Sequence, residues 1–197
     1  EIRCKKGVWF AGTMGIEGER KKVDHLLQVF RDMDRSDIGL VLVGGGMSED
    51  RKAKINPKNT LYLGQVHDTK NLKISKIFKA ADIFVVPGHV GLAVNQAFYW
   101  GLPVVTEEGH QPPEIQYLKS GRNGFIVGAN DITASKEKMF HLLDNEPLRV
   151  EFSRNARLDI LRDASIEGMF QGFHKAVEFV SCATSKSARR AQDAMAN

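Results

Sequence analysis

The chain has 197 residues, of which 42% are hydrophobic and 26% charged, and its formal net charge is +4. This composition is typical of a globular domain with its own core, and it excludes a disordered chain, a collagen-like repeat and a disulfide scaffold. No apolar run approaches the roughly 18 residues that span a bilayer, and no apolar signal-peptide core opens the chain.

Short apolar runs alternate with amphipathic segments along the chain. The runs with the pattern of buried strands are residues 7–12, 38–43, 60–63, 82–86, 103–106 and 124–127. The segments with helical periodicity are residues 23–33, 71–81, 91–100, 132–143, 147–161 and 165–180. The alternation predicts an α/β fold, with a Rossmann-like parallel sheet flanked by helices over residues 1–180. A polar tail, residues 181–197, is expected to fray.

Glycines stand where several of these strands end, and the strongest local pattern is residues 87–97. Ligands of such sheets bind outside the carboxyl ends of the strands. A helix that starts near Gly91 would offer unpaired N–H groups and a positive dipole end to a diphosphate. His89 lies within this turn and could donate to a sugar or phosphate oxygen. The alternative is a tight turn in which Gly91 serves only packing.

Other charged and polar residues allow two interpretations each. Residues 20–22, Arg-Lys-Lys, could reach a phosphate or form a solvated basic loop. The lysines every third residue from Lys70 to Lys79 could face anionic lipid, but such a stripe is more often a solvated helix face. His110 lies near Glu107, Glu108 and Glu114 in sequence, which is more typical of a solvated loop than of a site.

Several functional classes find no support in the sequence. No Walker loop or dinucleotide fingerprint is present, and the six histidines lack metal-ligand spacing, so no metal site is predicted. The net charge is too small and too scattered for nucleic acid. Cys4 and Cys182 form no motif, which favours a reducing, cytoplasmic compartment. Without an initiator Met, the chain is expected to be a fragment of a longer protein.

Five segments, in order, resemble a known family. "FAGTM…KKVDHLLQVF" is similar to the family's "vGRL…eKGvdlLieAf", and "IGLVLVGGG" to "l.ivGdG". "NTLYLGQV…IFKAADIFVVP", "GLAVNQAFYWGLPVV" and "PPEIQYLKSGRNGFIV" match its next three segments. The chain resembles, over about residues 6–180, the C-terminal donor-binding half of a retaining GT-B glycosyltransferase of family 4, glycosyl transferases group 1.

The resemblance implies a role for each matching residue. Gly12 and Thr13 would line the first turn near the diphosphate, with Lys21 as the phosphate cation that stabilises the leaving group. Gly64 and Val66 would hold the base through main-chain contacts. The N–H groups of three residues would bind the phosphates: Gly91, Leu92 and Ala93.

The sequence departs from the family pattern at three positions. Gly88 and Gln96 stand where the family has paired glutamates, and Thr13 stands where it usually has Arg. Gln96 can still bind the ribose hydroxyls, but without charge-assisted strength. At Gly88 a backbone group or the neighbouring His89 would have to contact the sugar instead.

The implied function is transfer of a sugar from a UDP- or GDP-sugar to a glycan or lipid-linked acceptor. The family implies retention of configuration, no metal and no cofactor besides the nucleotide-sugar substrate. Its catalytic residues would lie mainly in a missing N-terminal acceptor domain, so this fragment should bind donor but transfer little. The implied partners are the nucleotide-sugar, that domain and a peripheral membrane surface, without nucleic acid.

Three other readings stay open. A non-catalytic nucleotide- or phosphate-binding module would tolerate the loss of the paired glutamates. A nucleotide-sugar epimerase on the same fold would need an acid/base pair, and no convincing one is found. The third is a flavodoxin- or receiver-like domain. A receiver domain needs acidic residues at a strand end, where this chain has mainly glycines.

Overall fold

The computed structural model describes residues 6–11, 19–67, 69–70 and 72–195. Within them, six strands form one sheet in the order β3-β2-β1-β4-β5-β6, and every neighbouring pair is parallel. The strands are β1 (Lys6–Ala11), β2 (Ile38–Val43), β3 (Thr60–Tyr62), β4 (Ile83–Val85), β5 (Val104–Glu107) and β6 (Gly124–Val127). This confirms the α/β fold with a parallel sheet.

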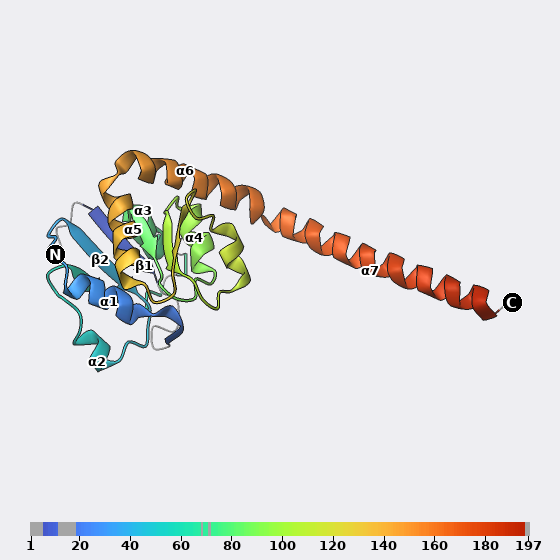
Figure 1. The fold of residues 1–197 in the computed structure, drawn as a ribbon, viewed down its shortest axis with the longest axis horizontal. Coiled ribbons are helices and arrows are strands. Elements are labelled where there is room, and N and C mark those ends of the chain that lie inside the picture. Colours follow the sequence, from blue (N-terminus) through green and yellow to red (C-terminus); the bar gives the residue numbers. More distant parts are fainter. Residues whose placement is uncertain (1–5, 12–18, 68, 71, 196–197) are drawn as a thin grey trace. The chain divides into compact units, whose positions relative to one another are not determined.

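Helices cover both faces of the sheet (Figure 1). The helices before the last one are α1 (Val23–Arg31), α2 (Glu49–Lys52), α3 (Leu72–Ala80), α4 (Ala93–Tyr99), α5 (Ile132–Asp144) and α6 (Glu146–Asp163). Two 3₁₀ turns join them, η1 (Glu19–Lys21) and η2 (Pro113–Tyr117). α3 contacts β1 and α4 contacts β5, whereas α5 contacts β4, β5 and β6 and also packs against α1.

Apolar side chains from both layers fill the core between the sheet and its helices. The largest side chains with less than 2% exposure include four phenylalanines: Phe30, Phe78, Phe84 and Phe98. They come from α1, α3, β4 and α4, so aromatic rings from the sheet and from three helices pack in the core. Each such burial contributes about 1.5–3 kcal/mol relative to an exposed side chain.

The sheet order places a switch point between β1 and β4. The chain moves from β1 to β2 in one direction and later crosses back to β4 on the other side of β1. Loops that leave neighbouring strands in opposite directions open a crevice at their carboxyl ends. The turn before α1 and the loop after β4 meet at this edge.

Most helix bounds lie within two residues of the predicted ones, and two of the differences have a physical explanation. α4 begins at Ala93 rather than near Gly91, because Gly91 has a φ of +60° and a right-handed helix excludes that conformation. The last helix, α7 (Ile166–Met195), does not end at Val180. It continues because residues 181–195 contain neither Gly nor Pro.

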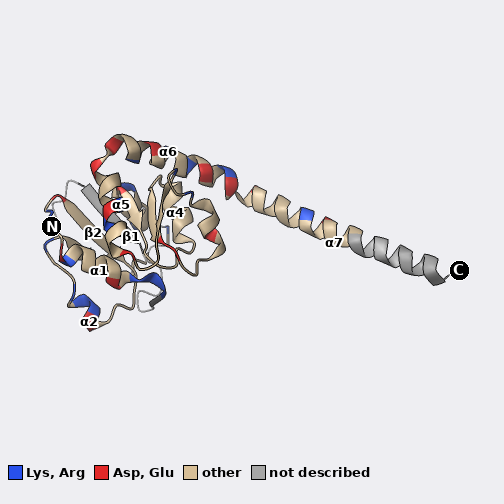
Figure 2. Ribbon diagram, viewed as in Figure 1, with Lys and Arg blue, Asp and Glu red and all other residues tan. Residues whose placement is uncertain are grey.

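The chain separates into two compact units, Glu1–Ile160 and Leu161–Asn197. The second unit exposes apolar side chains at helical spacing: Ile166, Phe170, Phe173, Val177 and Val180. Few charges interrupt this part of α7 (Figure 2). None of the described helices is both long enough and apolar enough to cross a bilayer.

We expect Gly124→Ala to lower the free energy of unfolding by about 1–3 kcal/mol, because an added methyl forces a close-packed strand apart. Gly124 pairs with Val104, and a Cβ there would overlap the carbonyl oxygen of Val104 and lie 2.5 Å from Leu118 Cδ1. Urea denaturation measures the change. Gly128→Ala is the matched control, because its Cβ would meet nothing closer than Asp131 Cβ at 3.8 Å. Equal stability of the two variants would contradict this packing.

Candidate functional site

A left-handed residue sets the direction of the turn before α1. Lys22 has a φ of 49°, a region that residues other than Gly rarely adopt, and it stands at the N-cap of α1. Its side chain is anchored at the far end, because Nζ donates to Glu107 Oε2 at 2.9 Å and to Asn130 Oδ1 at 2.8 Å. These bonds hold the turn that carries Arg20 and Lys21.

Glu107 is the centre of that anchor. It is the last residue of β5 and is fully buried. Besides Lys22, its carboxylate accepts from the Asn130 N–H at 2.9 Å and lies 2.7 Å from His25 Nδ1. A buried carboxylate is stable only when it is paired in this way. Glu107 therefore ties together β5, the start of α1 and the loop before α5.

The turn at residues 20–21 and the loop after β4 are joined backbone to backbone. The Gly88 N–H donates to Lys21 O at 3.1 Å, and the His89 N–H donates to Arg20 O at 2.7 Å. A Cβ at Gly88 would overlap Arg20 O and lie 2.8 Å from the carbonyl carbon of Lys21. The glutamate that the resembled family carries at this position therefore has no room in this backbone.

Lys21 reaches across this junction into the loop. Its Nζ donates to the carbonyl oxygens of His89 and Val90, the latter at 3.1 Å. Burial lowers the pKa of Lys21 below its usual value, the neighbouring Arg20 lowers it further, and the Glu114 carboxylate acts in the opposite direction. The ammonium lies 3.4 Å from the point where a Cβ of Gly91 would stand.

His89 presents a second donor to the same space. Arg20 Nη2 lies 3.2 Å from His89 Nε2, and a guanidinium can only donate, so Nε2 accepts and Nδ1 carries the hydrogen. Burial lowers the pKa of His89, and the charges of Arg20, Lys21 and His110 lower it further, whereas Glu114 raises it; the neutral ring is thus favoured. Nδ1 lies 4.0 Å from the Cβ point of Gly91.

The backbone around Gly91 supplies further donors. Among the described residues, the N–H groups of Gly91, Leu92 and Ala93 donate to no backbone carbonyl. The Val90 N–H, in contrast, donates to Gln111 Oε1 at 3.0 Å. Residues 91–93 and the ends of Lys21 and His89 thus form a cluster of donors around a position that has no side chain.

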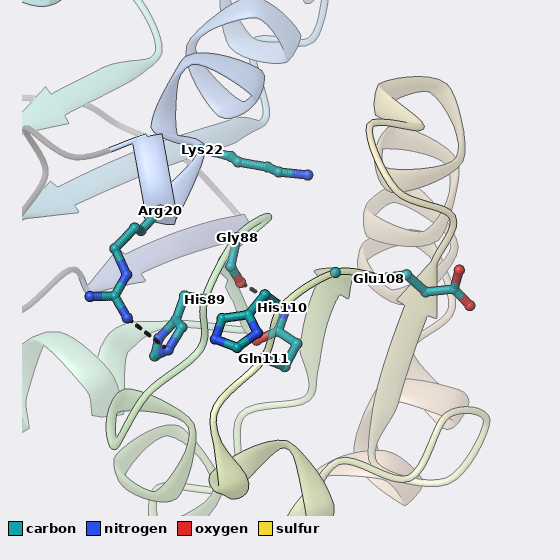
Figure 3. A pocket seen from close by; sticks show the side chains of 8 residues that line it. Arg20, Lys22, Gly88, His89, Glu108, His110 and Gln111 are labelled. Atoms are coloured by element: carbon teal, nitrogen blue, oxygen red, sulfur yellow. Dashed lines mark hydrogen bonds between the residues drawn. The ribbon is translucent and has the colours of Figure 1, made fainter.

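A pocket of about 190 Å³ adjoins this cluster (Figure 3). It is lined by Arg20, Lys22, Gly88, His89, Glu108, Gly109, His110 and Gln111. Figure 3 shows Arg20 directed at His89, His110 close to Gln111, and the carboxylate of Glu108 turned away from the other side chains. The lining is rich in groups that donate hydrogen bonds. A second hollow, of about 570 Å³, lies at the α5–α6 junction, beside Phe140 and His141.

The structure brings together only part of the predicted donor-binding set. Lys21 and His89 converge on Gly91, which is followed by Leu92 and Ala93. Gly64 and Val66 follow β3, which β2 and β1 separate from β4 in the sheet. Gln96 is half-buried on α4 and does not line the pocket. Gly12 and Thr13 lie outside the described residues.

Gln111 received no role from the sequence, which favoured a solvated loop for Glu107 and Glu114 beside His110; for Glu107 this prediction was wrong, because its side chain is fully buried. Glu107 ends an apolar strand, and this carboxylate within a buried run was the available signal. Glu114 Oε2 is buried without a hydrogen-bond partner among the described residues, and its charge acts on Lys21 and His89. Gln111 follows a polar loop and carries no local signal. Across the described chain, no three His, Cys, Asp or Glu side chains are grouped to hold a metal ion.

We expect Glu107→Gln to lower the free energy of unfolding by about 1.5–3 kcal/mol. The amide keeps one acceptor oxygen in place of two, and its NH₂ group would face a donor of Lys22 or His25. These partners are 27% and 22% exposed, so water offsets part of the loss. Chemical denaturation at neutral pH gives the value. The adjacent Glu108→Gln is the control and should change stability by less than about 0.5 kcal/mol, since Glu108 is exposed. Similar losses in both variants would refute the anchoring role.

The comparison with known proteins agrees with this geometry. The family model "Glycosyl transferases group 1" matches residues 5–159. An uncharacterized glycosyltransferase of Haemophilus influenzae is 26% identical over 161 residues, which are 77% of this chain and 44% of that protein. The poly(ribitol-phosphate) alpha-N-acetylglucosaminyltransferase of Staphylococcus aureus is 24% identical over 157 residues, 77% of this chain and 31% of that protein.

A solved structure has the same fold. A mutant of S. aureus TarM, in complex with fondaparinux, alpha-GlcNAc-glycerol and UDP, superposes with a TM-score of 0.74 at 20% identity, covering 87% of this chain and 35% of TarM. The chain spans less than half the length of the curated relatives that it matches. The family match covers more than three-quarters of the chain. The chain belongs to the glycosyl transferases group 1 family, and it has the Rossmann-like architecture of one half of a GT-B glycosyltransferase.

Proposed function

We propose that this chain is the donor-binding half of a glycosyltransferase that moves a sugar from a nucleoside-diphosphate sugar to a glycan or lipid-linked acceptor. The donor is a UDP- or GDP-sugar, the transfer retains the anomeric configuration, and no metal is needed. The acceptor and the other face of the sugar contact an N-terminal domain that is not part of this chain. The UDP in the TarM complex and the polymer in the name of the S. aureus relative support this proposal.

One observation carries the proposal: the ends of Lys21 and His89 converge on Gly91, which has no side chain, and the N–H groups of residues 91–93 donate to no backbone carbonyl among the described residues. Lys21 Nζ lies 3.4 Å and His89 Nδ1 lies 4.0 Å from the Cβ point of Gly91, next to the N–H groups of residues 91–93. A diphosphate has the charge and the number of acceptor oxygens to bind all of them. Any residue other than glycine would fill the space and be strained at a φ of +60°.

The same groups suit the chemistry of the transfer. Negative charge grows on the diphosphate as its bond to the anomeric carbon breaks. Donors that are fixed beside that charge stabilise the transition state more than the ground state. Lys21 is held in place by two carbonyl oxygens, so little reorganisation is required. We assign to it the stabilisation of the leaving group.

The adjoining pocket is suited to the sugar. Its volume of about 190 Å³ is below the roughly 300 Å³ at which drug-sized ligand pockets begin, so it holds one part of the donor only. We place the sugar there, against His89 and Gln111. The base then lies on the other side of the diphosphate, where the main chain at Gly64 and Val66 is available at the same edge of the sheet.

Thermal unfolding of this chain with UDP, GDP, ADP and CDP, each with and without magnesium, tests the proposal. At about 100 times the dissociation constant, binding adds roughly 2.7 kcal/mol, which raises Tm by on the order of 5–10 °C. We expect such a shift with UDP or GDP and the same shift when magnesium is absent. A shift that requires magnesium would contradict the metal-independent site, and no shift with any nucleotide would contradict donor binding by this half.

We expect Lys21→Gln to weaken binding of that nucleotide roughly 10–100-fold, since a charge-assisted hydrogen bond contributes about 1.5–3 kcal/mol. Isothermal titration calorimetry measures the affinity. Lys76→Gln is the matched control, because Lys76 is exposed on α3 and does not line the pocket. Equal affinities of the two variants would contradict the role of Lys21 as the cation that binds the diphosphate.

The lowered pKa of Lys21 gives this prediction a pH dependence. A bound anion favours the ammonium, so affinity falls as the pH rises through the pKa of the free protein, which lies below the usual value of about 10.4. Lys21→Arg keeps its charge throughout this range. The ratio of wild-type to Lys21→Arg affinity should therefore decline with pH, and a constant ratio would contradict a titrating Lys21. The ratio cancels the titration of the nucleotide itself.

A further inference from the structure

Gln111 joins the loops that follow β4 and β5 through both ends of its amide. Its Oε1 accepts the Val90 N–H at 3.0 Å. Its Nε2 donates to Gly88 O at 3.1 Å and to Glu107 O at 3.0 Å. The side chain also lines the pocket, where Figure 3 shows the bond to Gly88. One amide therefore satisfies three backbone groups, two in the loop after β4 and one at the end of β5.

These bonds fix the segment that presents the donors. Gly88 and Val90 flank His89, and Val90 precedes the turn of residues 91–93. By accepting the Val90 N–H, Gln111 orients the peptide group between His89 and Val90, and the carbonyl oxygen of that same group accepts from Lys21 Nζ. Thr106 Oγ1 donates mainly to Val86 O, at 2.7 Å, at the start of this loop; it lies 3.3 Å from Gly88 O, which is longer than either Gln111 bond to the loop.

We propose that Gln111 is a positioning residue for the nucleotide-sugar: it holds residues 88–90 in the conformation that places His89 Nδ1 and the N–H groups of residues 91–93 around the diphosphate. The inference rests on the proposed function. A loop that is fixed before binding loses less conformational entropy when the ligand arrives, so its affinity is higher. Without Gln111, three backbone groups lose a partner, and the loop has to be ordered by the ligand.

Two substitutions separate the parts of this role. Gln111→Met keeps the length of the side chain and removes every hydrogen bond. Gln111→Glu keeps an acceptor for the Val90 N–H, but it aims a carboxylate at the carbonyl oxygens of Gly88 and Glu107. The matched control is Gln116→Met, because Gln116 lies on η2 five residues away and is exposed.

The test measures affinity by calorimetry, using whichever of UDP, GDP, ADP and CDP gives the largest thermal shift with the wild-type chain. We expect about tenfold weaker binding for Gln111→Met, a larger loss for Gln111→Glu at neutral pH, and no change for Gln116→Met. Hydrogen exchange should show faster exchange of the Val90 amide in Gln111→Met. Circular dichroism and Tm report whether each variant is folded.

The pH profile of Gln111→Glu distinguishes positioning from general damage. A protonated carboxyl offers an acceptor to the Val90 N–H and one donor to one of the two carbonyl oxygens that Nε2 binds, so the variant should regain part of its affinity relative to wild type as the pH falls. The other titratable or charged groups around the amide are Arg20, Lys22, His89, Glu107, Glu108, His110 and Glu114. They are the same in both proteins, so the ratio of affinities largely cancels their titration.

Wild-type affinity in Gln111→Met, or a ratio for Gln111→Glu that does not change with pH, would overturn the positioning role while leaving the proposed function intact. Failure of the wild-type chain to bind any of the four nucleotides would instead overturn the proposed function, and the positioning role with it. The two failures are therefore distinguishable in one set of titrations.

Discussion

The site depends on one close approach between two backbones. The loop after β4 donates from Gly88 and His89 to the carbonyl oxygens of Lys21 and Arg20, and the space between them admits no side chain at Gly88. This contact brings a basic turn from the start of the chain against a loop almost 70 residues later. It is the reason that Lys21 meets His89 and Val90, and every charge interaction of the site follows from it.

The approach concentrates positive charge before any ligand is present. Arg20 and Lys21 each lower the pKa of His89, and Arg20 lowers that of Lys21. The body of the domain holds this arrangement from outside, through the buried Glu107 that anchors Lys22 and through the amide of Gln111. An anion that bound beside Gly91 would relieve the repulsion between like charges, so the electrostatics that strain the free protein favour an acidic ligand. Glu114 offsets part of this field, which keeps the loop from being purely cationic.

The sequence was sufficient for the strands and for their parallel arrangement, because apolar runs that end in glycine indicate burial and chain reversal directly. It also led to Lys21, His89 and Gly91. It could not reveal that α4 begins only at Ala93, since the left-handed conformation of Gly91 depends on contacts from other loops. The roles of Glu107 and Gln111 were missed for the same reason: their partners lie 20 or more residues away or belong to the backbone, and neither leaves a periodic pattern. The helix end predicted at Val180 was wrong, because the polar composition of residues 181–197 was taken to indicate a frayed tail. α7 continues to Met195.

The central claim is that donors around Gly91 bind the diphosphate of a nucleotide. Backbone amide NMR of this chain, titrated with UDP and separately with GDP, tests it most directly. The account predicts that the largest shifts for one of them occur at the amides of Gly91, Leu92 and Ala93, with smaller shifts near Gly64 and Val66. Saturable shifts confined to other regions, such as the hollow beside Phe140 and His141, with residues 91–93 unchanged, would contradict it.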